Sequence, residues 1–149
     1  IQIPLGMYLV DMDFSEKRLT IEDIHVAVGI SIFYLTILRL IYKTFNPTPN
    51  LNNSIFPGQK IIAKLNHVFL YISILMITIS GALKKLYNGE ELDMFFFNLE
   101  IQDNFDLAEI FYEIHILGNY TLIALISLHI FAVLIHKILF KENLLKRIL

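Results

Sequence analysis

The segment EIHILGNYTLIALISLHIFAVLIHK, from Glu113 to Lys137, contains three of the chain's five histidines in an otherwise apolar run. A run of this length crosses a bilayer as an α-helix, because about 20 apolar residues suffice. Ionisable side chains are costly inside a membrane and commonly mark functional sites there. His115, His129 and His136 are therefore candidates for a functional site.

The composition outside this segment is also that of a membrane protein. Hydrophobic residues make up 56% of the 149 residues and charged residues only 17%, whereas about a quarter of a soluble domain is charged. The mean hydropathy is +0.61. No Asp or Glu occurs between Ile24 and Gly89. The chain has no cysteine, which excludes disulfides, thiolate metal sites and Cys-x-x-Cys-His haem attachment.

Three apolar windows predict full membrane-spanning helices, over residues 24–43, 62–84 and 113–140. Residues 1–10 are apolar too, but ten helical residues rise only about 15 Å. They form either an interfacial segment or the last half of a first helix, and the polar stretch that follows favours the second interpretation. We therefore predict an all-α membrane protein, a four-helix transmembrane bundle with three full spans and a truncated first helix. Residues 1–149 form a single domain.

The distribution of basic residues predicts the orientation in the membrane. Eight of the 12 Lys and Arg residues fall on the side of the proline-rich connection NPTPNLNNSIFPG and the C-terminus. The positive-inside rule places that side in the cytoplasm. The longest connection, from Lys84 to Glu113, then lies outside. It is acidic and rich in aromatic residues, as either an aromatic belt at the interface or a docking surface for a partner would be. Without a basic patch, a net charge of −2 gives no indication of a nucleic-acid partner.

The histidines form two layers. His25 and His115 each stand at the outer start of a predicted helix, and fourteen residues later come Arg39 in one helix and His129 in the other. Fourteen residues rise about 21 Å and fall only roughly 40° short of four full turns, so the two positions in each helix share a face. Single histidines could instead bond to a neighbouring helix or lie at the headgroups. The matched depth and face favour a bis-histidine haem, which helical bundles commonly hold.

Four further residues could belong to the same site. Gly29 and Gly118 share a face with His25 and His115 respectively. Either they leave room for a flat macrocycle or they allow close helix packing, and Gly81 has the same ambiguity. Arg39 could pair with haem propionates or serve as a cytoplasmic anchor.

Two histidines near the inner ends of the spans are harder to assign. His67 could contact a propionate, line a quinone pocket with Tyr71, or lie at the interface. His136 lies seven residues beyond His129, toward the cytoplasm. We interpret His136 as interfacial.

These residues resemble the bacterial cytochrome b-561 family, within the broader group of di-haem membrane cytochromes b. The similarity runs from about Met7 to the C-terminus and is weakest in the outer connection. Three stretches show it, namely IHVAVGISIFYLTILRLIYKTFNPTP (24–49), KLNHVFLYISILMITISGAL (64–83) and EIHILGNYTLIALISLHIFAVLIHKILFKENLLKRIL (113–149).

The resemblance implies two haem b groups in the complete protein. The family's outer haem has ligands that match His25 and His115, and its inner haem has one that matches His129. The fourth ligand of the family is at the inner start of the first helix, which we expect to lie upstream of Ile1. Occupancy of the inner site in this chain therefore stays open.

The resemblance also implies the function. We expect a multi-pass protein of the bacterial inner membrane that carries electrons, exchanges them with the quinone pool and docks a redox donor or acceptor on one face. Association of two copies is compatible with this. One alternative is a cytochrome b anchor subunit of a hydrogenase or formate dehydrogenase, and another is a haem-free membrane scaffold. Quinone oxidoreductase activity stays open, but the sequence has no Ser-His-Asp arrangement, phosphate loop or intramembrane carboxylate pair that would indicate other catalysis.

Overall fold

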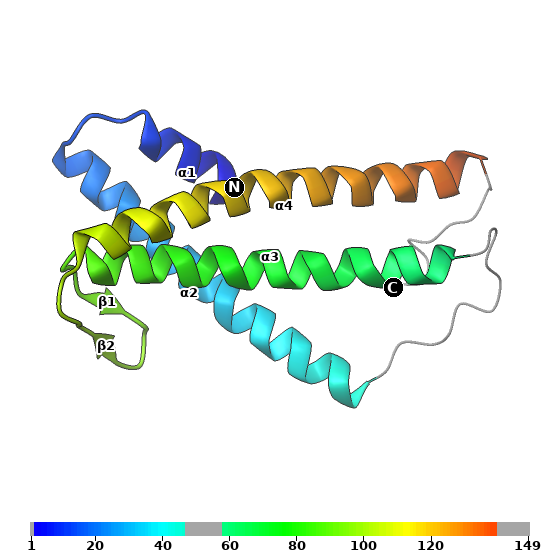
Figure 1. The fold of residues 1–149 in the computed structure, drawn as a ribbon, viewed down its shortest axis with the longest axis horizontal. Helices are drawn as coiled ribbons and strands as arrows, with labels where there is room; N and C mark the ends of the chain where they lie inside the picture. The colour runs from blue at the N-terminus through cyan, green and yellow to red at the C-terminus, as the bar shows by residue number, and fades with distance from the viewer. Residues whose placement is uncertain (1, 47–57, 140–149) are drawn as a thin grey trace.

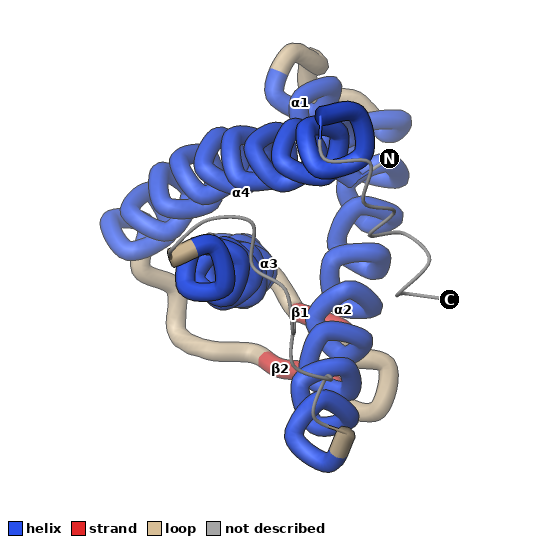
Figure 2. Tube along the Cα trace, turned by 90° about the vertical axis from the view of Figure 1, so that its right-hand side faces the viewer, coloured by secondary structure: helices blue, strands red, loops and turns tan. Residues whose placement is uncertain are grey.

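The computed structural model describes residues 2–46 and 58–139. They form α1 (Gln2–Val10), α2 (Glu16–Phe45), α3 (Gln59–Tyr87), β1 (Leu92–Asp93), β2 (Asn98–Leu99) and α4 (Phe105–Leu139). Figure 1 shows α3 and α4 side by side, and these two helices share the most extensive interface. Figure 2, seen from the end of the pair, shows α2 crossing it obliquely on one side. The prediction of an all-α membrane bundle is confirmed.

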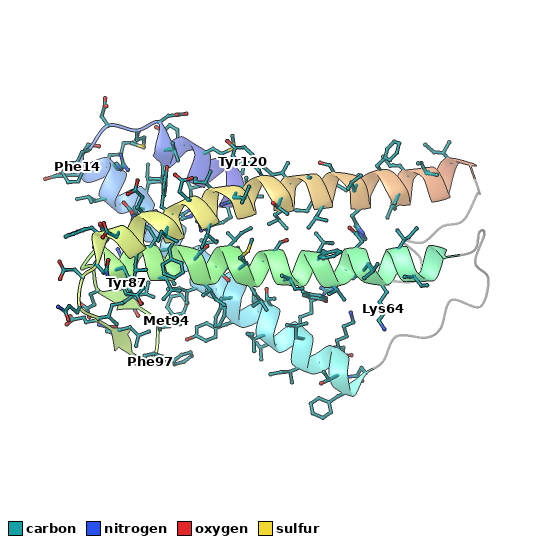
Figure 3. All side chains as sticks on the ribbon, viewed as in Figure 1. Phe14, Lys64, Tyr87, Met94, Phe97 and Tyr120 are labelled. Atoms are coloured by element: carbon teal, nitrogen blue, oxygen red, sulfur yellow. The ribbon has the colours of Figure 1, made fainter. Side chains whose placement is uncertain are left out.

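Three of these helices are long and apolar enough to cross a membrane. In their most apolar windows only 11% (α2), 11% (α3) and 6% (α4) of the residues are buried within the chain. Large apolar side chains cover the outside of the bundle instead, and Tyr120 of α4 points away from the other helices (Figure 3). Such helices are stable only where lipid or another apolar environment surrounds them.

The helices are longer than the apolar windows that predicted them. Both α2 and α4 begin eight residues before residues 24 and 113, and α3 extends the predicted 62–84 by three residues at each end. The Ser15 hydroxyl accepts a hydrogen bond from the Arg18 amide at 3.2 Å and caps α2. The Asn104 side chain accepts one from the Leu107 amide at 3.1 Å and caps α4. A hydropathy window detects the membrane-embedded part of a helix and misses such polar ends.

Some of the residues on which predictions rest lie outside the described part of the chain. They are residue 1 of the predicted first helix, most of the proline-rich connection, residue 140 of the predicted last span and the basic residues after it. The side chains of His136 and Lys137 are also outside the described part.

A network of charged side chains ties the outer ends of α2 and α3 together. Lys84 Nζ lies 3.2 Å from a Glu22 carboxylate oxygen. Lys85 Nζ lies 2.9 Å from Glu90 and 3.9 Å from Asp23. Because Lys85 bridges two carboxylates, it joins α2 to the start of the outer connection.

The pKa of Glu90 reflects this network. Burial raises the pKa of its carboxyl, but hydrogen bonds from Asn88 and Lys85 and the charges of Lys85 and Lys84 outweigh burial and leave the pKa below its ordinary value. Glu90 therefore stays ionised at neutral pH.

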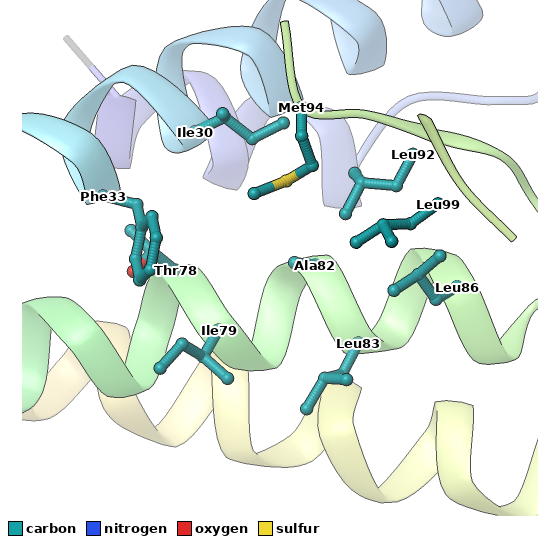
Figure 4. Close-up of a pocket in the computed structure, with 10 residues that line it drawn as sticks. All are labelled: Ile30, Phe33, Thr78, Ile79, Ala82, Leu83, Leu86, Leu92, Met94 and Leu99. Carbon is teal, nitrogen blue, oxygen red and sulfur yellow. The ribbon is translucent and has the colours of Figure 1, made fainter. Parts of the chain in front are cut away.

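The outer connection forms a hairpin that the sequence did not predict. In its two-residue strands Leu92 pairs with Leu99 and Asp93 with Asn98, antiparallel. Leu92 is the most deeply buried large side chain among the described residues and packs with Ile30 of α2 and Leu86 of α3. The hairpin thus completes an apolar pocket of about 160 Å³ between α2 and α3, shown in Figure 4.

Candidate functional site

His25 of α2 and His115 of α4 are brought together by the fold. Their ring centroids lie 6.2 Å apart with 72° between the ring planes. Two imidazoles on opposite sides of one metal ion, each at a metal–nitrogen distance of about 2 Å, have centroids roughly 6 Å apart. Rotation of either ring about its metal–nitrogen bond leaves this distance unchanged. The spacing of the pair would therefore allow both imidazoles to hold one haem iron.

Each of these imidazoles lies against a glycine of a neighbouring helix. A Cβ atom at Gly81 of α3 would lie 2.9 Å from both Cε1 and Nδ1 of His115. A Cβ atom at Gly6 of α1 would lie 3.0 Å from Cε1 of His25. The sequence indicated that Gly81 has a packing or cofactor role, whereas Gly6 was missed. A glycine in an apolar helix was the only available signal for Gly6, and it does not identify the neighbour.

Hydrogen bonding on α3 sets the tautomer of His115. Its Nδ1 lies 2.9 Å from the carbonyl oxygen of Ile77, which has no hydrogen to donate. Nδ1 must therefore carry the proton and donate it, which leaves Nε2 with a free lone pair. A metal-bound imidazole needs this tautomer, and such outer bonds orient the ligand. The absence of a side chain at Gly81 allows the ring to approach the α3 backbone closely enough to make this bond.

The orientation of the His25 imidazole is less completely fixed by hydrogen bonds than that of His115. Its carbonyl oxygen accepts a hydrogen bond from Gln2 Nε2 at 2.8 Å, which links α1 to α2. His25 Nδ1 and Gln2 Oε1 are the two buried side-chain polar atoms without a hydrogen-bond partner among the described residues. Orphaned buried polar atoms are rare and frequently mark functional sites. Together with the spacing of the rings and the two glycines, they show that the residues at this outer site fit a bis-histidine haem.

The predicted glycines Gly29 and Gly118 have different surroundings. A Cβ at Gly118 would lie 2.8 Å from a side-chain carbon of Ile77 and 3.1 Å from one of Met76, so Gly118 allows α4 to pack closely on α3. A Cβ at Gly29 would meet only the Gln2 amide nitrogen, at 3.6 Å. There is thus space for a methyl group beside Gly29. The cofactor role of both glycines stays a prediction.

The inner layer places His129 of α4 against two residues of α3. Its ring centroid is 5.3 Å from that of His67, with 51° between the planes. Its Nδ1 lies 2.9 Å from the side-chain amide of Asn66. The amide nitrogen faces the ring, so Asn66 donates to Nδ1 and the neutral imidazole carries its proton on Nε2. Binding of iron through Nε2 would require the amide to turn, so that its oxygen accepts the proton at Nδ1. Sequence reasoning missed Asn66.

Arg39 of α2 contacts α3 close to His67. Its Nε donates to the hydroxyl of Tyr71 at 3.0 Å, and Lys43 Nζ lies 5.1 Å from the centre of the Tyr71 ring. Tyr71 is one turn from His67 on α3. Arg39 also lines an open groove of about 370 Å³ on α2, with Ile32, Leu35 and Thr36. The guanidinium is therefore near the predicted inner site, but propionate binding stays a prediction.

Comparisons with known proteins show the family of the chain. A family described as prokaryotic cytochrome b561 matches residues 1–149. "Cytochrome b561 homolog 2" of Escherichia coli (strain K12) is 24% identical over 149 residues, which cover 97% of this chain and 79% of the relative. "Cytochrome b561 homolog 1" of the same organism is 27% identical over 137 residues, which cover 91% of this chain and 78% of the relative. The chain therefore belongs to the prokaryotic cytochrome b561 family, a family of membrane proteins for b-type haem electron transfer.

Proposed function

We propose that this chain is an integral carrier that exchanges electrons with the quinone pool and holds haem b between His25 and His115. The observation that carries the proposal is the separation of 6.2 Å between two imidazoles from different membrane-spanning helices. Bound there, haem supplies reversible one-electron chemistry. The chain supplies ligands, a low dielectric environment and fixed ring orientations, which set the potential of such a site.

The residues around the outer pair have distinct roles in this proposal. Gly6 and Gly81 let the two imidazoles approach the backbones of α1 and α3. The Ile77 carbonyl holds the Nδ1 proton of His115, so that Nε2 remains the donor atom. Gly29 is proposed to border the macrocycle, whereas Gly118 keeps α4 packed closely on α3.

A second haem b is proposed at the inner layer, with His129 as one axial ligand and Arg39 toward the propionates. His67 is an unsuitable opposite ligand, because its 5.3 Å separation from His129 is shorter than the roughly 6 Å that two imidazoles on one iron require. We assign His67 to the edge of this site, as a contact for a propionate or for quinone together with Tyr71. The charge distribution supports a cytoplasmic C-terminus in the bacterial inner membrane.

Haem content and difference spectra of purified variants test the proposal. His25→Ala and His115→Ala should each abolish the same component of the reduced-minus-oxidised spectrum. The double variant should lose no more than either single variant, because both side chains bind one iron. His67→Ala is the matched control and should keep this outer component. An unchanged outer component in the reduced-minus-oxidised spectrum of either ligand variant would overturn the assignment, and a wild-type chain without a Soret band would favour a haem-free scaffold.

A further inference from the structure

Three consecutive phenylalanines form the tip of the outer hairpin, and all three are exposed. The exposed fractions of Phe95, Phe96 and Phe97 are 51%, 83% and 53%. A single exposed apolar residue is ordinary on a protein surface. A contiguous group of exposed aromatic side chains instead indicates contact with an apolar partner or an interface.

Hydrogen bonds within the chain hold the backbone of the tip. The Met94 amide donates to the Phe97 carbonyl oxygen at 3.0 Å, and the Phe95 amide donates to an Asp93 carboxylate oxygen at 2.6 Å. Phe95 has φ 69°, a left-handed conformation that is unusual for an aromatic residue. The tip therefore presents its rings in a defined arrangement, with backbone groups of Met94, Phe95 and Phe97 already bonded within the chain.

The hairpin lies alongside the outer ends of α2 and α3 rather than beyond them, as Figures 1 and 3 show. The Tyr34 hydroxyl donates to the Met94 carbonyl oxygen at 3.1 Å. The Phe95 and Phe96 rings lie 6.5 and 6.0 Å from the Tyr34 ring. Tyr34 follows His25 by nine residues, which is about 13.5 Å along α2. Side chains lean toward the helix N-terminus, so the phenol reaches back from the apolar middle of α2 to the tip.

We propose that Phe95, Phe96 and Phe97 insert into the outer leaflet, so that lipid acyl chains cover the hairpin tip. The Phe96 ring contacts Tyr34 of α2, and Met94, which directly precedes the tip, lines the apolar pocket behind the hairpin (Figure 4). Aromatic residues are favoured at this depth, and backbone groups there must be bonded within the protein. Asp93 and Asn98 at the base of the tip mark the headgroup level.

The charges of the segment indicate which lipid property drives insertion. Residues 86–104 contain no Lys or Arg, while Glu90, Glu91, Asp93, Glu100 and Asp103 are acidic. Attraction to anionic headgroups therefore cannot hold the tip at the membrane. Insertion rests on apolar burial, and it should occur in zwitterionic lipid. This inference does not depend on haem binding.

A tryptophan at the tip tests the inference, because the chain contains no tryptophan of its own. Phe96→Trp would be reconstituted as the full chain, one copy per nanodisc, in phosphatidylcholine with or without bromine on the acyl chains. Bromine reports contact with lipid, and added iodide reports contact with water. Tyr120→Trp is the lipid-facing control on α4, and Gln102→Trp, in the exposed connection after β2, is the water-facing control. Haem content is matched between the two lipids, so quenching by haem cancels in their ratio.

We expect brominated lipid to quench Phe96→Trp by the same factor as Tyr120→Trp, and iodide to quench it no more than Tyr120→Trp. Quenching by iodide at the level of Gln102→Trp would overturn the inference, because the tip would then face water. Quenching by neither agent would also overturn it, because protein would then cover the tip. Phe97→Trp repeats the test if Phe96→Trp does not fold.

Discussion

Adding one methyl group at Gly81 should weaken haem binding at the outer site while the helices remain folded. The Cβ of Gly81→Ala would lie 2.9 Å from Cε1 and Nδ1 of His115, which is closer than carbon and nitrogen atoms approach without a bond. The His115 ring must move away from α3. It then loses or strains its hydrogen bond to the Ile77 carbonyl oxygen, now 2.9 Å long.

The size of the effect follows from these two contributions. Overpacking by one methyl group costs about 1–3 kcal/mol, and loss of one hydrogen bond costs about 1 kcal/mol. Together they amount to roughly 2–4 kcal/mol, which corresponds to roughly 30- to 1,000-fold weaker retention of haem. Alanine is a better helix former than glycine by about 1 kcal/mol, so helix content should not fall.

Transfer of haem from the purified protein to an excess of apomyoglobin measures this retention. Ala82→Val is the matched control, because it adds volume one residue away, into the pocket of about 160 Å³ that Ala82 lines. We expect fast haem loss from Gly81→Ala and near wild-type retention in Ala82→Val, with unchanged helix content in both. Equal retention in Gly81→Ala and wild type would refute the reasoning that His115 is a ligand held against Gly81.

Three further outcomes are expected. Gly29→Ala should lose haem from the outer site although the protein leaves room for the methyl group, and unchanged haem content would show that no macrocycle borders this position. If the Asn66 amide turns on haem binding so that its oxygen accepts the Nδ1 proton, this bond makes the His129 imidazole a stronger donor to ferric iron. Asn66→Leu removes a bond worth about 1 kcal/mol and should then raise the midpoint potential of the His129 component by up to roughly 40 mV; an unchanged redox titration would contradict this. Glu90→Gln should lower the thermal stability at pH 7. Because the folded pKa of Glu90 is lowered by Lys85 and its other partners, the difference from wild type should shrink as pH falls from about 4.5 through the folded value, and a difference independent of pH would count against the ion pair.

The membrane-spanning helices and the outer histidine pair could be predicted from the sequence because both follow from periodicity and depth. The apolar windows located α2, α3 and α4, and the position of His25 and His115 at the starts of two matched windows anticipated their proximity. The polar first turns of α2 and α4 were missed, because capping by Ser15 and Asn104 leaves no hydropathy signal.

Other features depend on contacts that no local pattern records. The two-residue strands at Leu92 and Leu99 are too short for an alternating pattern, and their pairing depends on burial of Leu92 between α2 and α3. The contacts of Asn66 with His129 and of Gly6 with His25 depend on the register of neighbouring helices. Such register is set by packing along whole helix faces and has no signature at the single residue.

The spin state of the oxidised haem tests most directly whether His25 and His115 bind the same iron. Electron paramagnetic resonance of the wild-type protein should show a low-spin ferric signal for the outer site, as two strong nitrogen ligands produce. His25→Gly and His115→Gly should each convert that same signal to high spin, and added imidazole should restore it in both. Persistence of the low-spin signal in either variant without imidazole would contradict the shared axial site on which the electron-carrier account rests.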